Sequence, residues 1–497
     1  MIPVLTAQEM RAADAQATAA SSDIVLMRNA GAAIARFLQD RCSEGPIVAL
    51  AGPGNNGGDA YAALAQLAAF RTCIIYGTHA ITGSAARADA IAAARAAGVE
   101  FRDLPIDDDA AQEAARDADW TLDALFGTGA RVPIDPVYAP SAAVLDARQR
   151  RVLAVDIPSP GVRASATVTF GALKADLLLE PGRENAGELW IADIGISQST
   201  LREHARTFAA LDDASFLDLL PARSRSADKR ESGAPLVIAG SAQFPGAAVL
   251  CALGAARAGA GYVTVAAPAA AADALHAHLI EQVVVPFHFK DDADDVAGEL
   301  LDVAKRNSSV AIGPGLGLDR WTGKMIRSFI ERCELPMVID ASGLFHLSKS
   351  LEILRGKRCV LTPHAGEFAR LSGKGTVPES ERVPRLREFV SRTGIVTLLK
   401  GASTLIDDGT IVTINATGTS ALATAGTGDV LTGIIATLLS QGLDVPDAAR
   451  AGAYWHGLAG AAAARERRVG VIAGDVAGSL AAALPVRPAP ATLLRYA

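Results

Sequence analysis

Three polar segments in the first half of the chain each follow a short apolar run that is typical of a β-strand. They are residues 52–59 (Gly-Pro-Gly-Asn-Asn-Gly-Gly-Asp), 122–129 (Leu-Asp-Ala-Leu-Phe-Gly-Thr-Gly) and 154–159 (Ala-Val-Asp-Ile-Pro-Ser). The carboxyl ends of parallel strands line the ligand crevice of an open sheet, so the polar side chains of these segments should converge. A lone Asp there is commonly a helix cap or a turn former, but three at strand ends indicate a functional site. The converging residues are Asn56, Asp59, Asp123, Asp156 and Ser159, whose oxygen donors favour K⁺ or Mg²⁺ over zinc.

The first segment contains the pattern G-x-G-x-x-G and leads into a predicted helix, whose terminal amides favour an anion. A dinucleotide-binding unit should have an acidic residue about 20 positions further on to hold the ribose. The second strand instead ends Ile-Tyr-Gly-Thr-His at residues 75–79, which disfavours an ordinary nicotinamide dehydrogenase. The alternative is a tight glycine turn without a ligand, but the adjacent Asn55 and Asn56 favour a binding loop.

In the second half, residues 424–431 (Thr-Ala-Gly-Thr-Gly-Asp-Val-Leu) begin an apolar helix. This helix terminus could stabilise a transferring phosphoryl group while Asp429 takes a proton from the attacking hydroxyl. The alternative is an N-capping Asp behind a glycine turn. Further motifs follow other apolar strands and should share the same sheet edge, which predicts a nucleotide and substrate cleft. These motifs are residues 313–317 (Gly-Pro-Gly-Leu-Gly), Asp340, residues 362–367 (Thr-Pro-His-Ala-Gly-Glu) and residues 400–402 (Lys-Gly-Ala).

The composition bounds the class of protein that must position these residues. The chain has 497 residues with a net charge of -7, and it is 50% hydrophobic and 20% charged, which excludes a disordered or nucleic-acid-coating protein. Its length predicts two to three domains. Five scattered cysteines without a Cys-x-x-Cys pair argue against disulfides and zinc, so we expect a reducing cytoplasm. No apolar run reaches the ~18 residues of a membrane span, and the polar N-terminus does not resemble an export signal.

Alternating strands and helices indicate an α/β fold in both halves. Residues 5–42 predict two helices with Gly31 as the breaker, and alternating strands and helices then follow. The sequence therefore predicts a doubly wound domain over residues 1–210 and a second α/β domain over residues 211–497, with no internal repeat that relates them. Residues 221–233 are predicted to be an exposed connection rather than an anion patch, and the tail from Pro485 is expected on the surface.

The first domain resembles the NAD(P)H-hydrate epimerases, whose signatures are similar to Asn-Asn-Gly-Gly-Asp, Asp-Ala-Leu-Phe-Gly-Thr-Gly and Asp-Ile-Pro-Ser-Gly. The resemblance implies a Rossmann-like fold in which Asn56, Asp123 and Ser159 coordinate K⁺ and Asp156 contacts the substrate as a catalytic residue. It also implies that the hydrated dinucleotide is held by Asn55, Asn56, Gly57, Gly58, Asp59, Gly127, Thr128, Gly129, Ala130, Arg131, Val132 and Pro133. The family's usual Ser-Gly-Leu-Asp and longer loop are replaced here by Ser-Pro-Gly-Val-Arg at residues 159–163. A binding or scaffolding module that has lost catalysis is therefore an alternative for this domain.

The second domain resembles the ribokinase-like superfamily and, within it, the ADP-dependent NAD(P)H-hydrate dehydratases, on the motifs Thr-Pro-His-x-Gly-Glu, Leu-Lys-Gly-Ala and Gly-Thr-Gly-Asp. The resemblance implies that Ala247, Gly317, His364 and Asp429 touch the hydrate. It implies that the adenine nucleotide binds to Lys400, Gly401, Ala402, Ser403, Thr404 and Gly428. The usual Asp-Ala-Asp-Ala-Leu appears here as Asp-Ala-Ser-Gly-Leu at residues 340–344.

Two domains that resemble enzymes for the same damaged cofactor predict a bifunctional repair enzyme. The resemblance implies that one domain interconverts the R and S hydrates, NADHX and NADPHX, and that the other dehydrates the S form while ADP gives AMP and phosphate. Mg²⁺ on the nucleotide is expected. The alternative is a small-molecule kinase fused to a cofactor-binding domain, against which the motifs at residues 362–364 and 400–402 argue. We expect a homo-oligomer with small-molecule substrates and no nucleic-acid or membrane partner.

Overall fold

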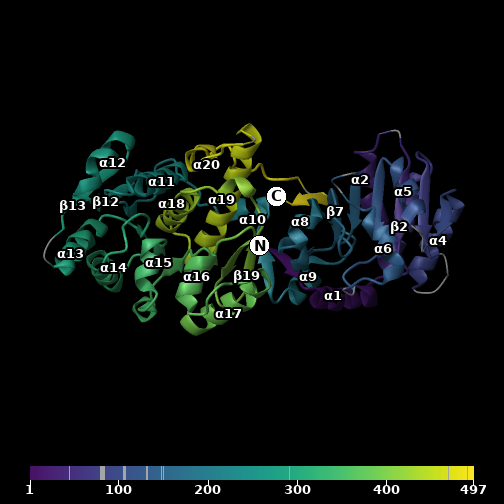
Figure 1. Cartoon of the computed structure of the whole chain (residues 1–497), viewed down its shortest axis with the longest axis horizontal. Helices are drawn as coiled ribbons and strands as arrows, with labels where there is room; N and C mark the ends of the chain where they lie inside the picture. The colour runs from purple at the N-terminus through teal and green to yellow at the C-terminus, as the bar shows by residue number, and fades with distance from the viewer. Residues whose placement is uncertain are drawn as a thin grey trace. The chain divides into compact units, whose positions relative to one another are not determined.

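The chain folds into two compact units, which the computed structural model describes for residues 1–43, 45–78, 84–104, 108–129, 133–146, 148, 150–289, 292–467, 469–489 and 491–496 (Figure 1). The first unit comprises residues 2–209 and 489–497, and the second comprises residues 210–488 together with Met1. The prediction that residues 211–497 form one domain therefore differs from the structure in the C-terminal tail. Among the described residues, no helix is long and apolar enough to cross a membrane.

A sheet in the order β20-β9-β7-β6-β5-β2-β3-β4 forms the centre of the first unit, and all pairs except β20–β9 are parallel. Its strands are β2 (Ile47–Ala51), β3 (Cys73–Gly77), β4 (Glu100–Asp103), β5 (Trp120–Ala124), β6 (Val152–Val155), β7 (Ala166–Phe170), β9 (Glu188–Ala192) and β20 (Leu493–Tyr496). Strands β2, β5, β6 and β7 are buried along their whole length, as expected for parallel strands covered on both faces. Separately, β1 (Ile2–Leu5) pairs in parallel with β8 (Leu173–Lys174).

Helices surround this sheet. They are α1 (Ala7–Ala20), α2 (Asp23–Gln39), α3 (Asn55–Leu67), α4 (Ala85–Ala96), α5 (Asp108–Arg116), α6 (Ala139–Ala143), α7 (Ala175–Leu178), α8 (Gly182–Ala186) and α9 (Gln198–His204). The two predicted N-terminal helices are present, but the break between them falls at Ser21 and Ser22 rather than at Gly31. Gly31 lies inside α2, where a Cβ atom would come within 2.6 Å of the Ala62 Cβ atom, so this glycine allows α2 to pack closely on α3.

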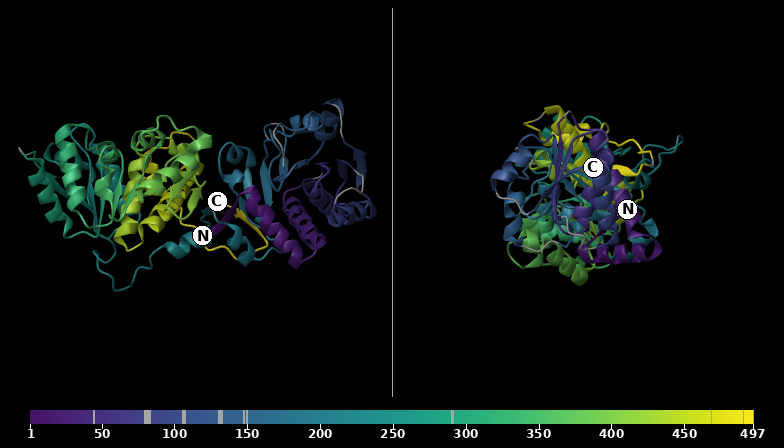
Figure 2. Two further views of the ribbon diagram at one scale, coloured as in Figure 1. Left: turned by 90° about the horizontal axis from the view of Figure 1, so that it is seen from below. Right: turned by 90° about the vertical axis from the view of Figure 1, so that its right-hand side faces the viewer.

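The C-terminal tail returns to the first unit. Strand β20 pairs antiparallel with β9, and the Arg495 guanidinium forms a 3.2 Å ion pair with Glu188. Tyr496 is 3% exposed. In Figure 2 the yellow end of the chain accordingly lies beside elements of the first unit. The pairing is a contact between segments about 300 residues apart, which explains why the local sequence predicted only a surface tail.

The second unit contains a sheet whose strands run in the order β13-β12-β11-β14-β15-β16-β17-β18-β19. They are β11 (Pro235–Ile238), β12 (Thr264–Pro268), β13 (Val283–Phe287), β14 (Ser309–Ile312), β15 (Met337–Ile339), β16 (Cys359–Leu361), β17 (Val396–Leu399), β18 (Thr404–Asp407) and β19 (Val412–Asn415). The pairs from β13 to β17 are parallel, whereas β18 pairs antiparallel with both β17 and β19. Strand β10 (Phe208–Ala210) spans the point where the chain passes from one unit to the other.

The helices of the second unit are α10 (Asp213–Leu219), α11 (Pro245–Arg257), α12 (Ala272–His278), α13 (Ala293–Ala304), α14 (Arg320–Arg332), α15 (Ser342–Leu347), α16 (Ala365–Ser372), α17 (Arg382–Thr393), α18 (Thr427–Ser440), α19 (Val445–Arg467) and α20 (Ala473–Ser479). Helices α11 and α18 pack with their backbones almost in contact. A Cβ atom at Gly433 would lie 2.0 Å from the Cys251 carbonyl oxygen, and one at Gly254 would lie 2.4 Å from the Val430 carbonyl oxygen. This close packing fixes the position of α18, and therefore of Asp429 in its first turn.

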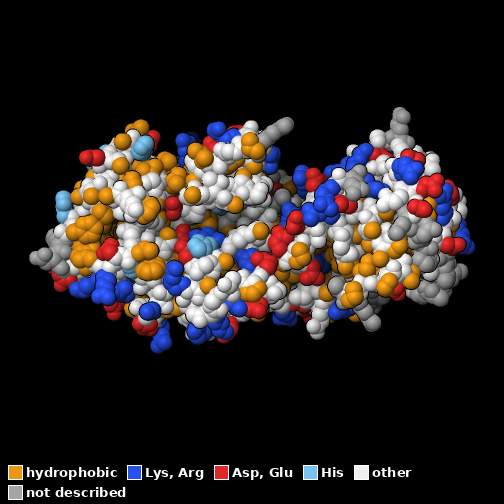
Figure 3. Space-filling model, in the orientation of Figure 1, with side chains coloured by type: hydrophobic (Ala, Val, Ile, Leu, Met, Phe, Trp, Pro, Cys, Tyr) orange, Lys and Arg blue, Asp and Glu red, His pale blue; other side chains and the backbone are white. Residues whose placement is uncertain are grey.

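The structure confirms the predicted α/β class with two large, mainly parallel sheets. Residues 221–233 have neither helix nor strand and are mostly exposed. On the face shown in Figure 3, basic and acidic side chains are interspersed, in keeping with the near balance of 47 Lys and Arg against 54 Asp and Glu.

Candidate functional sites

A cavity of 540 Å³ lies in the first unit beside the carboxyl ends of β2, β5 and β6. The loop after β2 brings α3 close to the loop after β5, because a Cβ atom at Gly52 would lie 1.9 Å from the Leu125 carbonyl oxygen. The predicted residues that line this cavity are Asn55, Asn56, Asp59, Gly127, Thr128, Gly129 and Asp156. Gly57 and Gly58 are buried within α3, and Pro133 is exposed away from the cavity lining. Ala130, Arg131 and Val132 lie outside the described residues.

The residues predicted to coordinate K⁺ meet around the backbone of Phe126. Asn56 donates a 3.1 Å hydrogen bond to the Phe126 carbonyl oxygen, and the Phe126 amide donates to the Ser159 hydroxyl at 3.1 Å. The Ser159 amide and hydroxyl each donate to the Asp123 carboxylate at 2.6 Å. Burial raises the pKa of Asp123 to about 6 despite these donors. The cluster thus combines carboxylate, hydroxyl, amide and carbonyl oxygens, a donor set that suits a hard cation.

Asp156 is held by a lysine that the sequence analysis did not identify. The Lys174 ammonium donates to the Asp156 carboxylate at 2.6 Å, to the Thr169 hydroxyl at 2.9 Å and to the Phe170 carbonyl oxygen at 2.7 Å. The backbone of Asp156 has φ 67°, a left-handed conformation that is rare for a residue other than glycine. Lys174 is only 2% exposed, so the cavity wall contains a buried ion pair.

Two more carboxyl groups face this pair. Asp14, on α1, lines the cavity, and burial together with the nearby Asp156 raises its pKa to about 6, although Lys174 acts to lower it. Asp59 is 9% exposed, and burial, reinforced by Asp156 and Asp14, raises its pKa well above the usual range. The sequence signal for Asp14 was only a polar position in an amphipathic helix, which did not distinguish it from a solvated residue.

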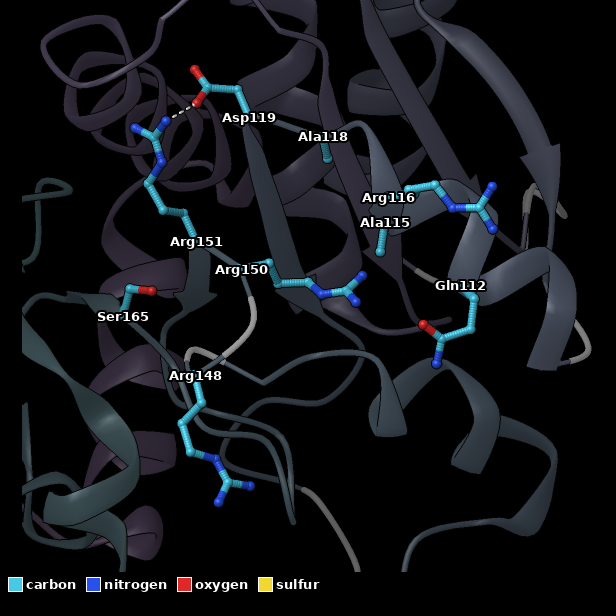
Figure 4. A pocket seen from close by; sticks show the side chains of 9 residues that line it. All are labelled: Gln112, Ala115, Arg116, Ala118, Asp119, Arg148, Arg150, Arg151 and Ser165. Atoms are coloured by element: carbon cyan, nitrogen blue, oxygen red, sulfur yellow. Dashed lines mark ion pairs between the residues drawn. The ribbon is translucent and has the colours of Figure 1, made fainter.

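The first unit has a second hollow, of 720 Å³, at the opposite edge of the same sheet (Figure 4). Its residues precede β5, β6 and β7, and Arg151 pairs there with Asp119. The described residues that line it include none of the predicted site residues. Among the polar residues that were predicted at the strand ends, Asn56, Asp59 and Asp156 instead line the smaller cavity of 540 Å³.

In the second unit, Asp429 occupies the first turn of α18 directly after the left-handed Gly426, whose φ is 89°. Burial raises the pKa of Asp429 to about 7, and the neighbouring Asp340 and Glu367 add to this effect while Lys400 opposes it. A carboxyl group with a pKa near neutrality can accept and return a proton at physiological pH. The positive end of the helix dipole beside it favours negative charge.

Lys400 and Asp340 form the polar centre next to this helix. The Lys400 ammonium lies 2.9 Å from the Asp340 carboxylate and 4.0 Å from Glu367. Although burial acts to lower the pKa of Lys400, these carboxylates together with Asp429 raise it. Asp340 also accepts a 2.8 Å hydrogen bond from the Thr432 hydroxyl of α18. A Cβ atom at Gly428 would lie 3.4 Å from the Lys400 nitrogen, so Gly428 faces the same centre.

The other predicted residues of the second unit lie around this centre in two groups. His364 and Gly317 line a cavity of 430 Å³ with Glu367, and His364 also caps α16 by accepting the Gly366 amide at 3.0 Å. Ala247 approaches the same loop, since a Cβ atom at Gly315 would lie 2.8 Å from the Ala247 Cβ atom. Among the nucleotide-site predictions, Gly401 lies against the Arg382 guanidinium, Ser403 is buried, Ala402 is exposed, and Thr404 begins β18.

His456 of α19 belongs to no motif that the sequence reveals. This side chain is 8% exposed and hydrogen-bonds the backbone of Thr427 at the start of α18. Burial lowers its pKa to about 4, so it is a neutral imidazole that supports the helix terminus.

The two sheets and their clefts define an α/β enzyme with two chemically distinct sites. Residues 23–177 match the family model described as YjeF-related protein N-terminus, and residues 235–481 match the one described as NAD(P)H-hydrate dehydratase. A bifunctional NAD(P)H-hydrate repair enzyme of Pyrobaculum aerophilum is 36% identical over 476 residues, which cover 91% of this chain and 92% of that protein. One of Moorella thermoacetica is 34% identical over 509 residues and covers 95% of each chain. The ADP/ATP-dependent NAD(P)H-hydrate dehydratase of Bacillus subtilis has a solved structure with 28% identity and a TM-score of 0.48, covering 56% of this chain and 97% of that chain.

The chain therefore belongs to the family of bifunctional NAD(P)H-hydrate repair enzymes. This confirms the predicted enzyme class, an epimerase domain joined to a dehydratase domain. The roles assigned to single residues, the K⁺ ion and the oligomeric state stay predictions.

Proposed function

We propose that the chain repairs hydrated NADH and NADPH in two steps at these two sites. The first unit interconverts the R and S hydrates in the 540 Å³ cavity. The second unit dehydrates the S hydrate while ADP is converted to AMP and phosphate. The observation that carries this proposal is the placement of Asp429, a carboxyl group with a pKa of about 7, in the first turn of a helix beside Lys400 and Asp340.

The dehydration follows from this placement. Asp429 takes the proton of the hydrate's hydroxyl group, whose oxygen attacks the terminal phosphate of ADP, and AMP leaves. The amides of residues 426–428 stabilise the charge that develops on the phosphoryl group, and Lys400 stands close enough to contribute. The lone pair of the ring nitrogen then expels phosphate and forms a carbon–nitrogen double bond, and loss of a proton from the neighbouring ring carbon restores the nicotinamide ring. Mg²⁺ would enter with the nucleotide and neutralise its phosphate charge, because this ion is usually held by substrate phosphates and one or two carboxylates.

For the first unit, the oxygen cluster around Phe126 supports a K⁺ site built from Asn56, Asp123 and Ser159. The ion would supply positive charge to this cluster of oxygen atoms. The residues themselves hold that loop against α3, since both Asn56 and Ser159 bond to Phe126. The short loop after Ser159 leaves this cluster intact, which favours an active epimerase over a scaffolding module.

The test is to mix the full chain with separated R and S hydrates of NADH, ADP and Mg²⁺, and to follow the return of NADH absorbance. Recovery from both hydrates only when nucleotide is present is the expected result. Recovery from the S hydrate alone would contradict the epimerase function and favour the scaffolding alternative. No recovery, with a stable phosphorylated product, would favour the small-molecule kinase. The Asp156→Ala variant adds a second check, because unchanged turnover of the R hydrate would exclude Asp156 from catalysis.

A further inference from the structure

The first cavity contains four ionisable side chains that face one another from separate elements. Asp14 comes from α1, Asp59 from α3, Asp156 from the end of β6 and Lys174 from the end of β8, and all four line the same cavity. Each of the carboxyl groups of Asp14 and Asp59 interacts electrostatically with Asp156 and with Lys174. The chain thus brings together residues up to 160 positions apart, which is not how solvated surface charges are arranged.

The roles of these groups differ because their surroundings differ. The Asp156 carboxylate accepts hydrogen bonds from the Lys174 ammonium at 2.6 Å, the Thr169 hydroxyl at 3.1 Å and the Phe170 amide at 3.2 Å, which fix its position in the cavity wall. Asp59 is 9% exposed, and its burial, reinforced by the charges of Asp156 and Asp14, favours its neutral form. Asp14 is half-buried at the cavity wall, where both protonation states are accessible.

We propose that Asp14 is the proton donor and acceptor of hydrate epimerisation, and that Lys174 is a positioning residue that holds Asp156 as a carboxylate against the cationic ring. This inference rests on the proposed epimerase function of the first unit. The pKa of about 6 that burial gives Asp14 supports the role, because a general acid that must also act as a base works best when its pKa lies near the working pH.

The chemistry balances without an external reactant. The hydroxyl-bearing carbon of the hydrate is next to the ring nitrogen, whose lone pair forms a carbon–nitrogen double bond as the carbon–oxygen bond breaks. The leaving hydroxide takes the proton of Asp14 and becomes water. The ring is then cationic. Its positive charge and that of the Lys174 ammonium are balanced by two negative charges, those of the newly formed Asp14 carboxylate and the Asp156 carboxylate. A solvent water adds to the opposite face of the ring, and the proton that it loses is passed back to the Asp14 carboxylate through the released water, which leaves the other epimer.

The proposed roles of Asp14 and Lys174 predict how the rate of hydrate epimerisation depends on pH. The other charged or titratable groups that line the cavity are Arg11, Asp23, Asp59 and Asp156. The step begins with protonated Asp14, so the enzymic rate should fall as the pH rises through about 6. Lys174 acts to lower the pKa of Asp14, so removal of its charge should move this inflection to higher pH.

The experiment follows the interconversion of separated R and S hydrates by chromatography, without nucleotide, between pH 5 and pH 9, after subtraction of the rate without enzyme. We expect Asp14→Asn to lower the enzymic rate by ~10²-fold or more and to abolish the inflection. We expect Lys174→Met to lower the rate and to move the inflection upward, and Lys174→Arg to restore part of the rate. Glu113→Gln, an exposed change on α5, is the matched control and should leave the rate unchanged.

Dehydration of the S hydrate with ADP, measured on the same samples, reports whether the rest of the chain is folded. An Asp14→Asn rate within threefold of the unaltered chain, or a Lys174→Met profile with an unmoved inflection, would overturn the inference while leaving the epimerase function in place. No catalysed interconversion by the unaltered chain would instead overturn the epimerase function itself, and this inference with it.

Discussion

Replacement of Asp429 by Asn should abolish dehydration while it stabilises the fold. The change keeps the size of the side chain but removes the carboxylate that takes the proton from the hydrate. Loss of a general base lowers a rate by ~10² to ~10⁴-fold, which corresponds to about 3 to 5 kcal/mol of lost transition-state stabilisation. We therefore expect S-hydrate turnover with saturating ADP to fall by at least ~10²-fold.

The effect on stability follows from the raised pKa. Burial raises the pKa of Asp429 from 3.8 to about 7 in the folded chain, so the folded chain binds more protons than the unfolded chain between these values. The stability that protonated Asp429 contributes is fully present below its pKa in the unfolded chain, and it is lost as the pH rises through its folded-state pKa of about 7. At pH 8 the carboxylate thus destabilises the fold, by an upper limit of about 4 kcal/mol. Asparagine carries no charge and should raise the melting temperature at pH 8 but not at pH 4.

The assay pairs S-hydrate turnover with thermal unfolding at pH 4 and pH 8. Asp302→Asn is the matched control, because Asp302 is an exposed acid of α13 that forms an ion pair with the equally exposed Lys305, the C-cap residue of that helix. This control variant should change neither the turnover of the S hydrate nor the melting temperature. Turnover by the Asp429→Asn variant within tenfold of the unaltered chain would refute the role of Asp429, and a melting temperature lowered at pH 8 would refute the reasoning about its burial.

Three further predictions concern the second unit. The rate of dehydration should rise with pH through about 7, because Asp429 must be deprotonated to act as the base; a rate that is flat between pH 6 and pH 8 at saturating substrate would contradict this. Lys400→Met should lower the free energy of unfolding by about 3 kcal/mol in urea titrations, because Asp340, which is 2% exposed, would keep a buried charge without its cation. This value is at the low end of the usual cost of breaking a buried ion pair, because the Lys400 side chain is 22% exposed. An unchanged unfolding midpoint would contradict this prediction. Gly433→Ala should destabilise the fold by about 1 to 3 kcal/mol, because its Cβ atom would lie 2.0 Å from the Cys251 carbonyl oxygen, whereas Gly474→Ala, where a Cβ atom meets nothing within 4 Å, should be tolerated.

The sequence by itself determined the class of the fold and the strand ends at which the candidate site residues lie. Buried parallel strands require apolar runs, and polar residues at or just after the ends of such runs come to lie at one edge of the sheet, so the positions of Asp123, Asp156 and Asp340 could be predicted from a local pattern. The motifs around them were specific enough to indicate the family that the comparisons confirm. Local patterns suffice here because both the strand and the turn that follows it are encoded within about ten residues.

Only the tertiary structure decided which distant side chains complete each site. Lys174 and Asp14 carry no motif, and their proposed roles arise because packing places both beside Asp156, with Lys174 buried and Asp14 half-buried, so that water solvates their charges less. The ion pair of Lys400 with Asp340 joins residues 60 positions apart, and the return of β20 to β9 joins segments about 300 positions apart. A charge is perturbed only by neighbours within a few ångströms and by loss of water, and neither quantity can be read from spacing along the chain.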